Sequence, residues 1–84
     1  MEVPIVTDVK PIEDMNLIVT FEGGIVKRYD MKILYDKFPI FKSLEGNPLF
    51  KLARPEVGGV AIIWNDDIDL SRYDIWFDGE DCTE

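Results

Sequence analysis

Four carboxylates lie close together near the C-terminal end of the sequence: Asp66, Asp67, Asp69 and Asp74. Clustered carboxylates are the ligands that hard cations such as Mg²⁺ and Ca²⁺ prefer. The spacing does not fit the calcium-loop pattern, which needs acidic residues at alternate positions, a glycine at the sixth position and a glutamate at the twelfth. We therefore interpret these carboxylates as surface charge on a turn and near a helix N-terminus, and we expect no metal and no cofactor.

Residues for nucleophilic catalysis are scarce in this sequence. It contains no histidine, which removes the commonest general base. The single cysteine, Cys82, lies in an acidic segment that disfavours a reactive thiolate. The glycine pairs at 23–24 and 58–59 lack the spacing and the lysine of a phosphate-binding loop. We therefore expect no catalytic residues and no enzymatic activity, with a metal-dependent enzyme at the acidic turn as the weakest of three alternatives.

The length and composition predict one small globular domain. The sequence has 84 residues, of which 46% are hydrophobic, and one cysteine, so an intrachain disulfide cannot form. We expect a single domain over residues 1–84 with loose ends at 1–4 and 80–84. The sequence has neither a run of about twenty apolar residues nor a basic-then-apolar leader, so we expect a cytoplasmic protein without a membrane segment.

The charge is strongly segregated along the chain. The net charge is −8, yet residues 27–55 hold seven basic and three acidic residues, and residues 56–84 hold Arg72 and nine acidic residues. Such a surface keeps a small protein soluble, and it also suits a basic protein partner or self-association between the basic and acidic segments. A net acidic protein is a poor candidate for nucleic-acid binding, because it cannot neutralise many phosphates.

The first half of the sequence predicts three antiparallel strands. β-Branched residues predict a strand over 5–13, where Pro11 favours a sheet edge. Clean alternation predicts a strand over 16–22, with one apolar face formed by Leu17, Val19 and Phe21. Glycines then mark a turn, and a return strand follows over 25–31.

The loop length in this hairpin decides which residues face each other. A two-residue loop would place Leu17 opposite Asp30, a charge on the apolar face. A loop over 22–24 places Leu17 opposite Tyr29 instead. We therefore predict the longer loop, with Gly24 in the left-handed conformation of a bulged hairpin.

The second half predicts short helices and a second pair of strands. We expect a helical turn within 30–37, a short helix from Pro39 to Gly46, and a short strand or coil over 49–54 with Phe50 and Leu52 inward. A buried strand over 60–64, a turn over 65–67 and a returning strand over 68–70 lead to a helix over 73–77, capped by Ser71. Trp64 and Trp76 are expected in the core. The fold class is therefore α+β: a mostly antiparallel sheet of about four to six strands, covered by one or two short helices.

An ordered set of landmarks spans about residues 8–79 and points to a family. The landmarks are Leu17-x-Val19-x-Phe21 before Gly23-Gly24, then Tyr29-Asp30-Met31, Phe41-x-x-Leu44, Gly59-x-x-Ile62-x-Trp64-Asn65, and Asp69-Leu70 before a helix. With this pattern the chain resembles the small bacterial proteins known as domain of unknown function 2442. The resemblance implies a compact α+β fold without a catalytic motif, in a gene arrangement similar to toxin–antitoxin pairs. Some members carry a helix-turn-helix segment, for which these 84 residues have no room.

These observations favour a non-enzymatic protein-interaction module, the antitoxin-like member of a two-protein system. The residues expected to face a basic partner are the C-terminal carboxylates Asp66, Asp67, Asp69, Asp74 and Asp78. The alternative is a nucleic-acid-associated regulator that uses Lys27 and Arg28 of the hairpin.

Overall fold

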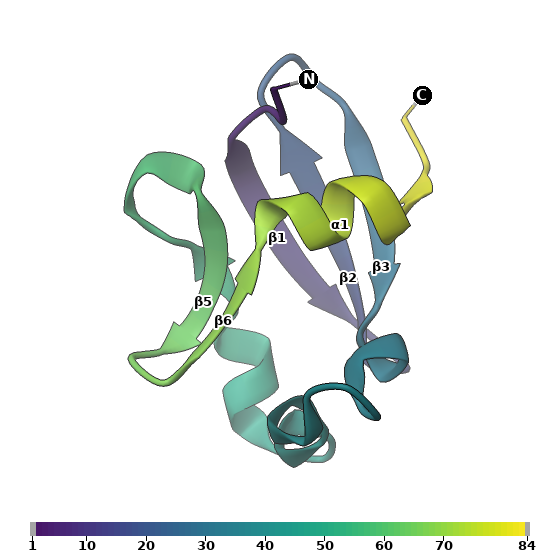
Figure 1. Cartoon of the computed structure of the whole chain (residues 1–84), viewed down its shortest axis with the longest axis vertical. Helices are drawn as coiled ribbons and strands as arrows, with labels where there is room; N and C mark the ends of the chain where they lie inside the picture. Colours follow the sequence, from purple (N-terminus) through teal and green to yellow (C-terminus); the bar gives the residue numbers. More distant parts are fainter. Residues whose placement is uncertain (1, 84) are drawn as a thin grey trace.

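The computed structural model describes residues 2–83 and has an α+β architecture built on two antiparallel sheets (Figure 1). The first sheet has the order β1-β2-β3-β7, with β1 Val6–Ile12, β2 Asn16–Phe21, β3 Val26–Asp30 and β7 Glu80–Asp81. The second has the order β4-β5-β6, with β4 Arg54–Pro55, β5 Ala61–Asn65 and β6 Ile68–Ser71. The helical elements are η1 Met31–Leu34, η2 Pro39–Leu44, η3 Pro48–Leu52, η4 Val57–Gly59 and α1 Arg72–Asp78.

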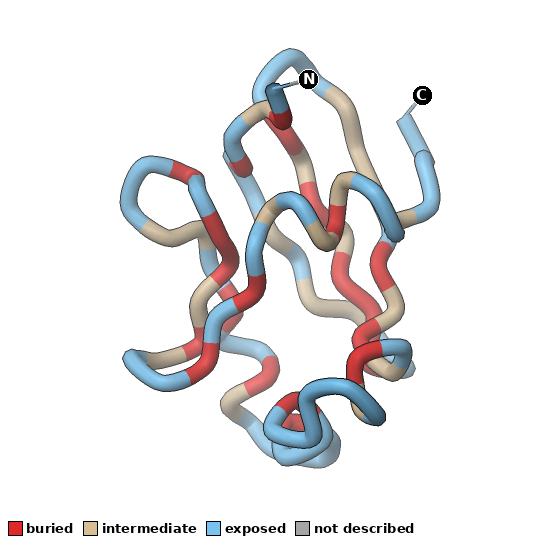
Figure 2. Tube along the Cα trace, in the orientation of Figure 1, coloured by how far each residue is buried: buried red, intermediate tan, exposed pale blue. Residues whose placement is uncertain are grey.

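The alternating face of β2 forms the centre of the core, as predicted. Leu17, Val19 and Phe21 are fully buried, and in Figure 2 buried stretches occur along strands of both sheets. The hairpin has the predicted longer loop, because Leu17 pairs with Tyr29 and the Phe21 N–H donates to the Ile25 carbonyl. A shift of one residue would have turned this entire apolar face towards water.

Helix α1 lies across the first sheet and begins where the sequence predicted (Figure 1). The Ser71 hydroxyl caps it by accepting from the Tyr73 N–H at 3.2 Å. Ile75 is buried in the core, and the Trp76 ring meets Phe21 edge-on at a centroid distance of 5.1 Å. Among the described residues, no helix has the length and apolar character needed to cross a membrane.

The two sheets meet where the segment before β5 crosses the start of β1. Gly59 has a φ of +69°, and a side chain there would lie 2.5 Å from the Val6 carbonyl oxygen. Arg72 spans the same junction, since its guanidinium donates to the carbonyls of Val3 and Val60, each at 3.3 Å. The two sheets are therefore joined by backbone contact as well as by the shared core.

The segment 49–54 differs from its sequence expectation in two ways. It contains the 3₁₀ helix η3 rather than a short strand or coil, and Leu52 is 59% exposed because Phe50 alone of the two faces the core. The expected α+β fold with antiparallel strands is confirmed, and its strands form two sheets.

At the two ends of the chain, where we expected loose segments at 1–4 and 80–84, several described residues contact the rest of the fold. Val3 is buried, and Glu80–Asp81 form β7 against β3. The Cys82 N–H extends this pairing by donating to the Val26 carbonyl at 2.9 Å. Residues 1 and 84 lie outside the described part of the chain.

Gly59 and Gly46 offer a matched test of the junction between the sheets. Both have a φ of +69°, but only Gly59 has neighbouring atoms where a Cβ would be placed. We expect Gly46→Ala to lower the free energy of unfolding by about 1–2 kcal/mol, the cost of a left-handed alanine. Gly59→Ala should lower it by about 1–3 kcal/mol more, because the methyl group separates the two backbones. Urea denaturation of both variants measures the difference, and equal losses would contradict the close contact.

Candidate functional site

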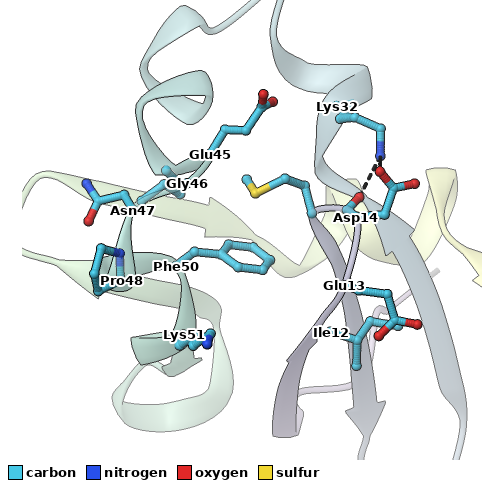
Figure 3. A pocket seen from close by; sticks show the side chains of 12 residues that line it. Ile12, Glu13, Asp14, Lys32, Glu45, Gly46, Asn47, Pro48, Phe50 and Lys51 are labelled. Atoms are coloured by element: carbon cyan, nitrogen blue, oxygen red, sulfur yellow. Dashed lines mark hydrogen bonds and ion pairs between the residues drawn. The ribbon is translucent and has the colours of Figure 1, made fainter.

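Two of the hollows on the surface of residues 2–83 bring together charged and apolar side chains from several elements. The first, of about 630 Å³, lies between the β1–β2 turn and the segment that joins η2 to η3 (Figure 3). The second, of about 270 Å³, lies between η2, β6 and the start of α1. Only the second is lined by carboxylates that the sequence singled out.

The first hollow is bordered by an unusual turn. Asp14 and Met15 have φ values of 62° and 56°, in the left-handed region that favours glycine. Three partners hold this turn in place. The buried Asn16 amide donates to the Asp14 carbonyl at 2.8 Å, the Lys32 ammonium donates to the same carbonyl, and the Met31 N–H donates to the Met15 carbonyl at 2.9 Å. The surrounding polar groups therefore offset the cost of the backbone conformation.

Lys32 is the charged group that reaches between the elements around this hollow. Its Nζ lies 3.0 Å from an Asp30 carboxylate oxygen and 3.2 Å from one of Asp14, the contact drawn in Figure 3. The hydrogen bond that Lys32 donates to the Asp30 carboxylate raises the pKa of Lys32. Burial alone would raise the pKa of Asp30, but the hydrogen bonds from Lys32 outweigh it and lower that pKa. This cation is thus already neutralised and holds the turn together.

The second hollow, which we call the acidic groove, combines apolar side chains with carboxylates. Its apolar and hydroxyl lining comes from Phe38, Ile40, Phe41, Ile68, Leu70 and Ser71, and its carboxylates are Asp67, Asp69 and Asp74. These residues come from η2, from the turn and strand at β6, and from the first turn of α1. The groove therefore brings a central segment of the chain next to its acidic C-terminal third.

Local backbone chemistry positions the carboxylates of the groove. The Asn65 side-chain oxygen accepts from the N–H groups of Asp67 and Ile68, both at 2.9 Å, and so fixes the turn into β6. Along β6, alternate side chains point to opposite faces. Ile68 enters the core, so Asp69 must point outward, and it is exposed.

The apolar side of the groove is an edge-to-face stack of aromatic rings that leads out of the core. Phe41 meets the buried Trp64 at a centroid distance of 6.1 Å, and Phe38 meets Phe41 at 6.3 Å. The outer members of this face are accessible, with Phe38 44% and Ile40 48% exposed. Accessible apolar surface thus lies directly beside the carboxylates.

The five predicted partner-facing carboxylates are not gathered in one place. Asp67, Asp69 and Asp74 line the acidic groove, whereas Asp66 is exposed in the turn and Asp78 is exposed at the end of α1. Within residues 2–83, none of the five forms an ion pair. No set of three or more potential ligands in that range is placed to hold a metal ion.

The two basic residues of the alternative hypothesis have structural contacts. Lys27 lies over the Trp76 ring, with Nζ 4.9 Å from the centroid, and Arg28 Nε donates to the Asn16 side-chain oxygen at 3.0 Å. Each also lies opposite an acidic residue of β7, Lys27 opposite Asp81 and Arg28 opposite Glu80. Because of these acidic neighbours, the electrostatic potential around Lys27 and Arg28 is less positive than the sequence of the hairpin indicates.

The sequence did not indicate that Phe38 and Ile40 form an exposed part of the groove. An α-helix over the expected range from Pro39 to Gly46 would place Ile40 on one apolar face with Phe41 and Leu44. In a 3₁₀ helix residues three apart share a face, so Phe41 and Leu44 are buried together and Ile40 is not. The proline at the first position suits an α-helix equally well, so only the brevity of the segment favoured a 3₁₀ helix.

Comparison with known proteins yields one match. A family model described as "Protein of unknown function (DUF2442)" matches residues 6–80. No curated protein and no solved structure matches the chain.

The Tyr29 hydroxyl is buried in the core, where the negative charges of two α1 carboxylates influence its ionisation. Tyr29 is 1% exposed, and its hydroxyl has no hydrogen-bond partner among the described residues. Burial raises the pKa of Tyr29 above its ordinary value, and the negative charges of Asp74 and Asp78 raise it further. The folded protein therefore keeps this phenol neutral at a pH where the unfolded chain ionises it.

We predict a pH-dependent stability that depends on Tyr29. The unfolded-state pKa is about 10, so above this pH the unfolded chain loses a proton that the folded state retains, and the free energy of unfolding falls. Tyr29→Phe removes this loss, and at neutral pH it should leave stability equal or higher because no buried donor stays unpaired. Urea denaturation from pH 8 to about 11 measures both effects, and equal declines in the two proteins would contradict the prediction.

Proposed function

The chain belongs to the DUF2442 family, and from that premise we propose that it is a protein-interaction module whose acidic groove binds a basic, partly apolar segment of another protein. The carboxylates of Asp67, Asp69 and Asp74 supply the charge, and Phe38 and Ile40 supply the apolar contact. A basic protein partner fits this surface better than nucleic acid does, because phosphates would be repelled by the same carboxylates.

The single observation that carries the proposal is the position of unpaired carboxylates beside accessible aromatic surface. In residues 2–83 the three groove carboxylates have no cationic partner, while Phe38 and Ile40 remain about half exposed. Interfaces commonly combine a small apolar centre with a charged rim that selects the partner and speeds association. A groove of this kind suits recognition of a short segment rather than a chemical reaction.

We further propose that the partner is the second member of a two-protein system and that this chain has the antitoxin-like role. Support comes from the acidic balance of the chain, with a net charge of −8, and from the resemblance to a family with that gene arrangement. An acidic protein that covers a basic surface on its partner can block that surface, as an antitoxin-like protein must.

Neutralising the groove should weaken partner binding without unfolding the protein. The test variant is Asp67→Asn, Asp69→Asn, Asp74→Asn, and the control is Glu2→Gln, Asp8→Asn, Glu22→Gln, which has the same net charge but changes exposed residues elsewhere. Each exposed ion pair contributes about 0.2–1 kcal/mol, so we expect affinity for the partner to fall on the order of tenfold in the groove variant.

Each variant is tagged and immobilised at low salt. The measurement is how much of the neighbouring gene's protein product it retains. Retention by the wild type and the control, but not by the groove variant, is the expected result. Failure of the wild type to retain that protein, or equal losses in both variants, would reject the proposed interaction.

A further inference from the structure

We propose that the partner segment binds the acidic groove as an extended strand that pairs with the free edge of β6. In this arrangement basic side chains of the partner face Asp67 and Asp69, and the alternate, apolar side chains cover Phe38 and Ile40. The inference rests on the proposed function and adds the conformation and the sequence pattern of the partner. Addition of a strand to an open sheet edge is a general mode of peptide recognition.

β6 has a hydrogen-bonded neighbour on one side only. It ends the order β4-β5-β6, and the acidic groove runs along its other side, lined by every residue from Asp67 to Ser71. An unpaired edge of this kind presents a row of N–H and C=O groups in the geometry that an added strand needs.

The register of β5 with β6 identifies the groups that face the groove. The Arg72 N–H donates to the Val60 carbonyl at 3.4 Å, and Ile62 pairs with Leu70 two residues further along. In an antiparallel ladder, pairs that exchange hydrogen bonds alternate with pairs whose backbone groups point away. The backbone groups of Asp69 and the N–H of Ser71 therefore point away from β5, towards the open side.

The two faces of β6 set the pattern of the added strand. Leu70 and Ile68 point to the core side, where the ring stack from Trp64 to Phe38 continues past the edge. Asp69 points to the opposite, exposed side. Because cross-strand neighbours lie on the same face, the partner needs apolar residues on the first side and basic residues on the second. An alternating basic–apolar strand satisfies both.

Charge repulsion disfavours β6 of a second copy as the added strand. Antiparallel pairing of two β6 strands would place Asp67 and Asp69 of one copy alongside their equivalents in the other, and like charges in adjacent strands repel. The same carboxylates protect the open edge from self-association and favour a basic strand. The negative charge of these residues thus repels another acidic strand and attracts a basic one.

The direct test uses a blocked heptapeptide of alternating lysine and valine. A peptide of the same composition with its lysines contiguous is the control, since it keeps the charge but cannot present two different faces. We expect saturable amide shifts and slowed hydrogen exchange at Asp69 and Ser71 with the alternating peptide at about 1–5 mM, and binding on the order of threefold weaker with the control.

Ser71→Pro tests the edge itself, with Ser71→Ala as its matched control. Ser71 has a φ of −62°, which suits proline, and both substitutions remove the hydroxyl that caps α1. Only the proline removes the outward N–H and fills the space beside it. We expect Ser71→Pro to bind the alternating peptide about tenfold more weakly than Ser71→Ala does, with both folded by circular dichroism.

If Ser71→Pro fails to fold, hydrogen exchange at Asp69 and Ser71 of the wild type decides the matter. Strand addition would be overturned by any one of four results. These are equal affinity of the two Ser71 variants, equal binding of the two peptides, unchanged hydrogen exchange at these amides in the bound state, or no binding of either peptide. None of these results tests retention of the partner protein. The proposed function is tested separately, by the retention experiment with the groove variant.

Discussion

Burial of the apolar face of β2 beneath α1 is the interaction on which the rest of the structure depends. A helix of seven residues cannot persist alone in water, so α1 exists because Ile75 enters the core and Trp76 packs against Phe21. Lys27 covers the outer face of the same tryptophan. The position of Asp74 in the acidic groove follows from this packing, which connects the stability of the core to the shape of the binding surface.

The hairpin and the C-terminal unit could be predicted because local rules and burial agree there. A strand with one buried face has only one acceptable register, and a charge opposite Leu17 excluded the alternative loop. The turn at Asn65 and the cap at Ser71 were similarly predictable, because each uses a short side chain to satisfy neighbouring N–H groups. The charge of the candidate site was therefore evident in the sequence, although its shape was not.

The parts that escaped prediction depend on distant neighbours. Ile40 is partly exposed because η2 is a 3₁₀ helix, and only the packing of Phe41 on Trp64 shows which side is inward. The segment Glu80–Asp81 is short and acidic, which is typical of a loose chain end, yet it pairs as a strand with the open edge of β3. The way the two sheets meet likewise depends on the close approach of Gly59 to Val6, which no local sequence pattern contains.

Helix α1 is continuous with an edge strand of each sheet: it follows β6 in one and precedes β7 in the other (Figure 1). It therefore connects the two sheets covalently through one edge strand of each. Lifting it from the core would strain the outermost strand at both of its ends, so the sheets cannot separate while their edges stay intact. A protein this small consequently has little room for partial opening, and loss of either sheet should dismantle the whole in a single step.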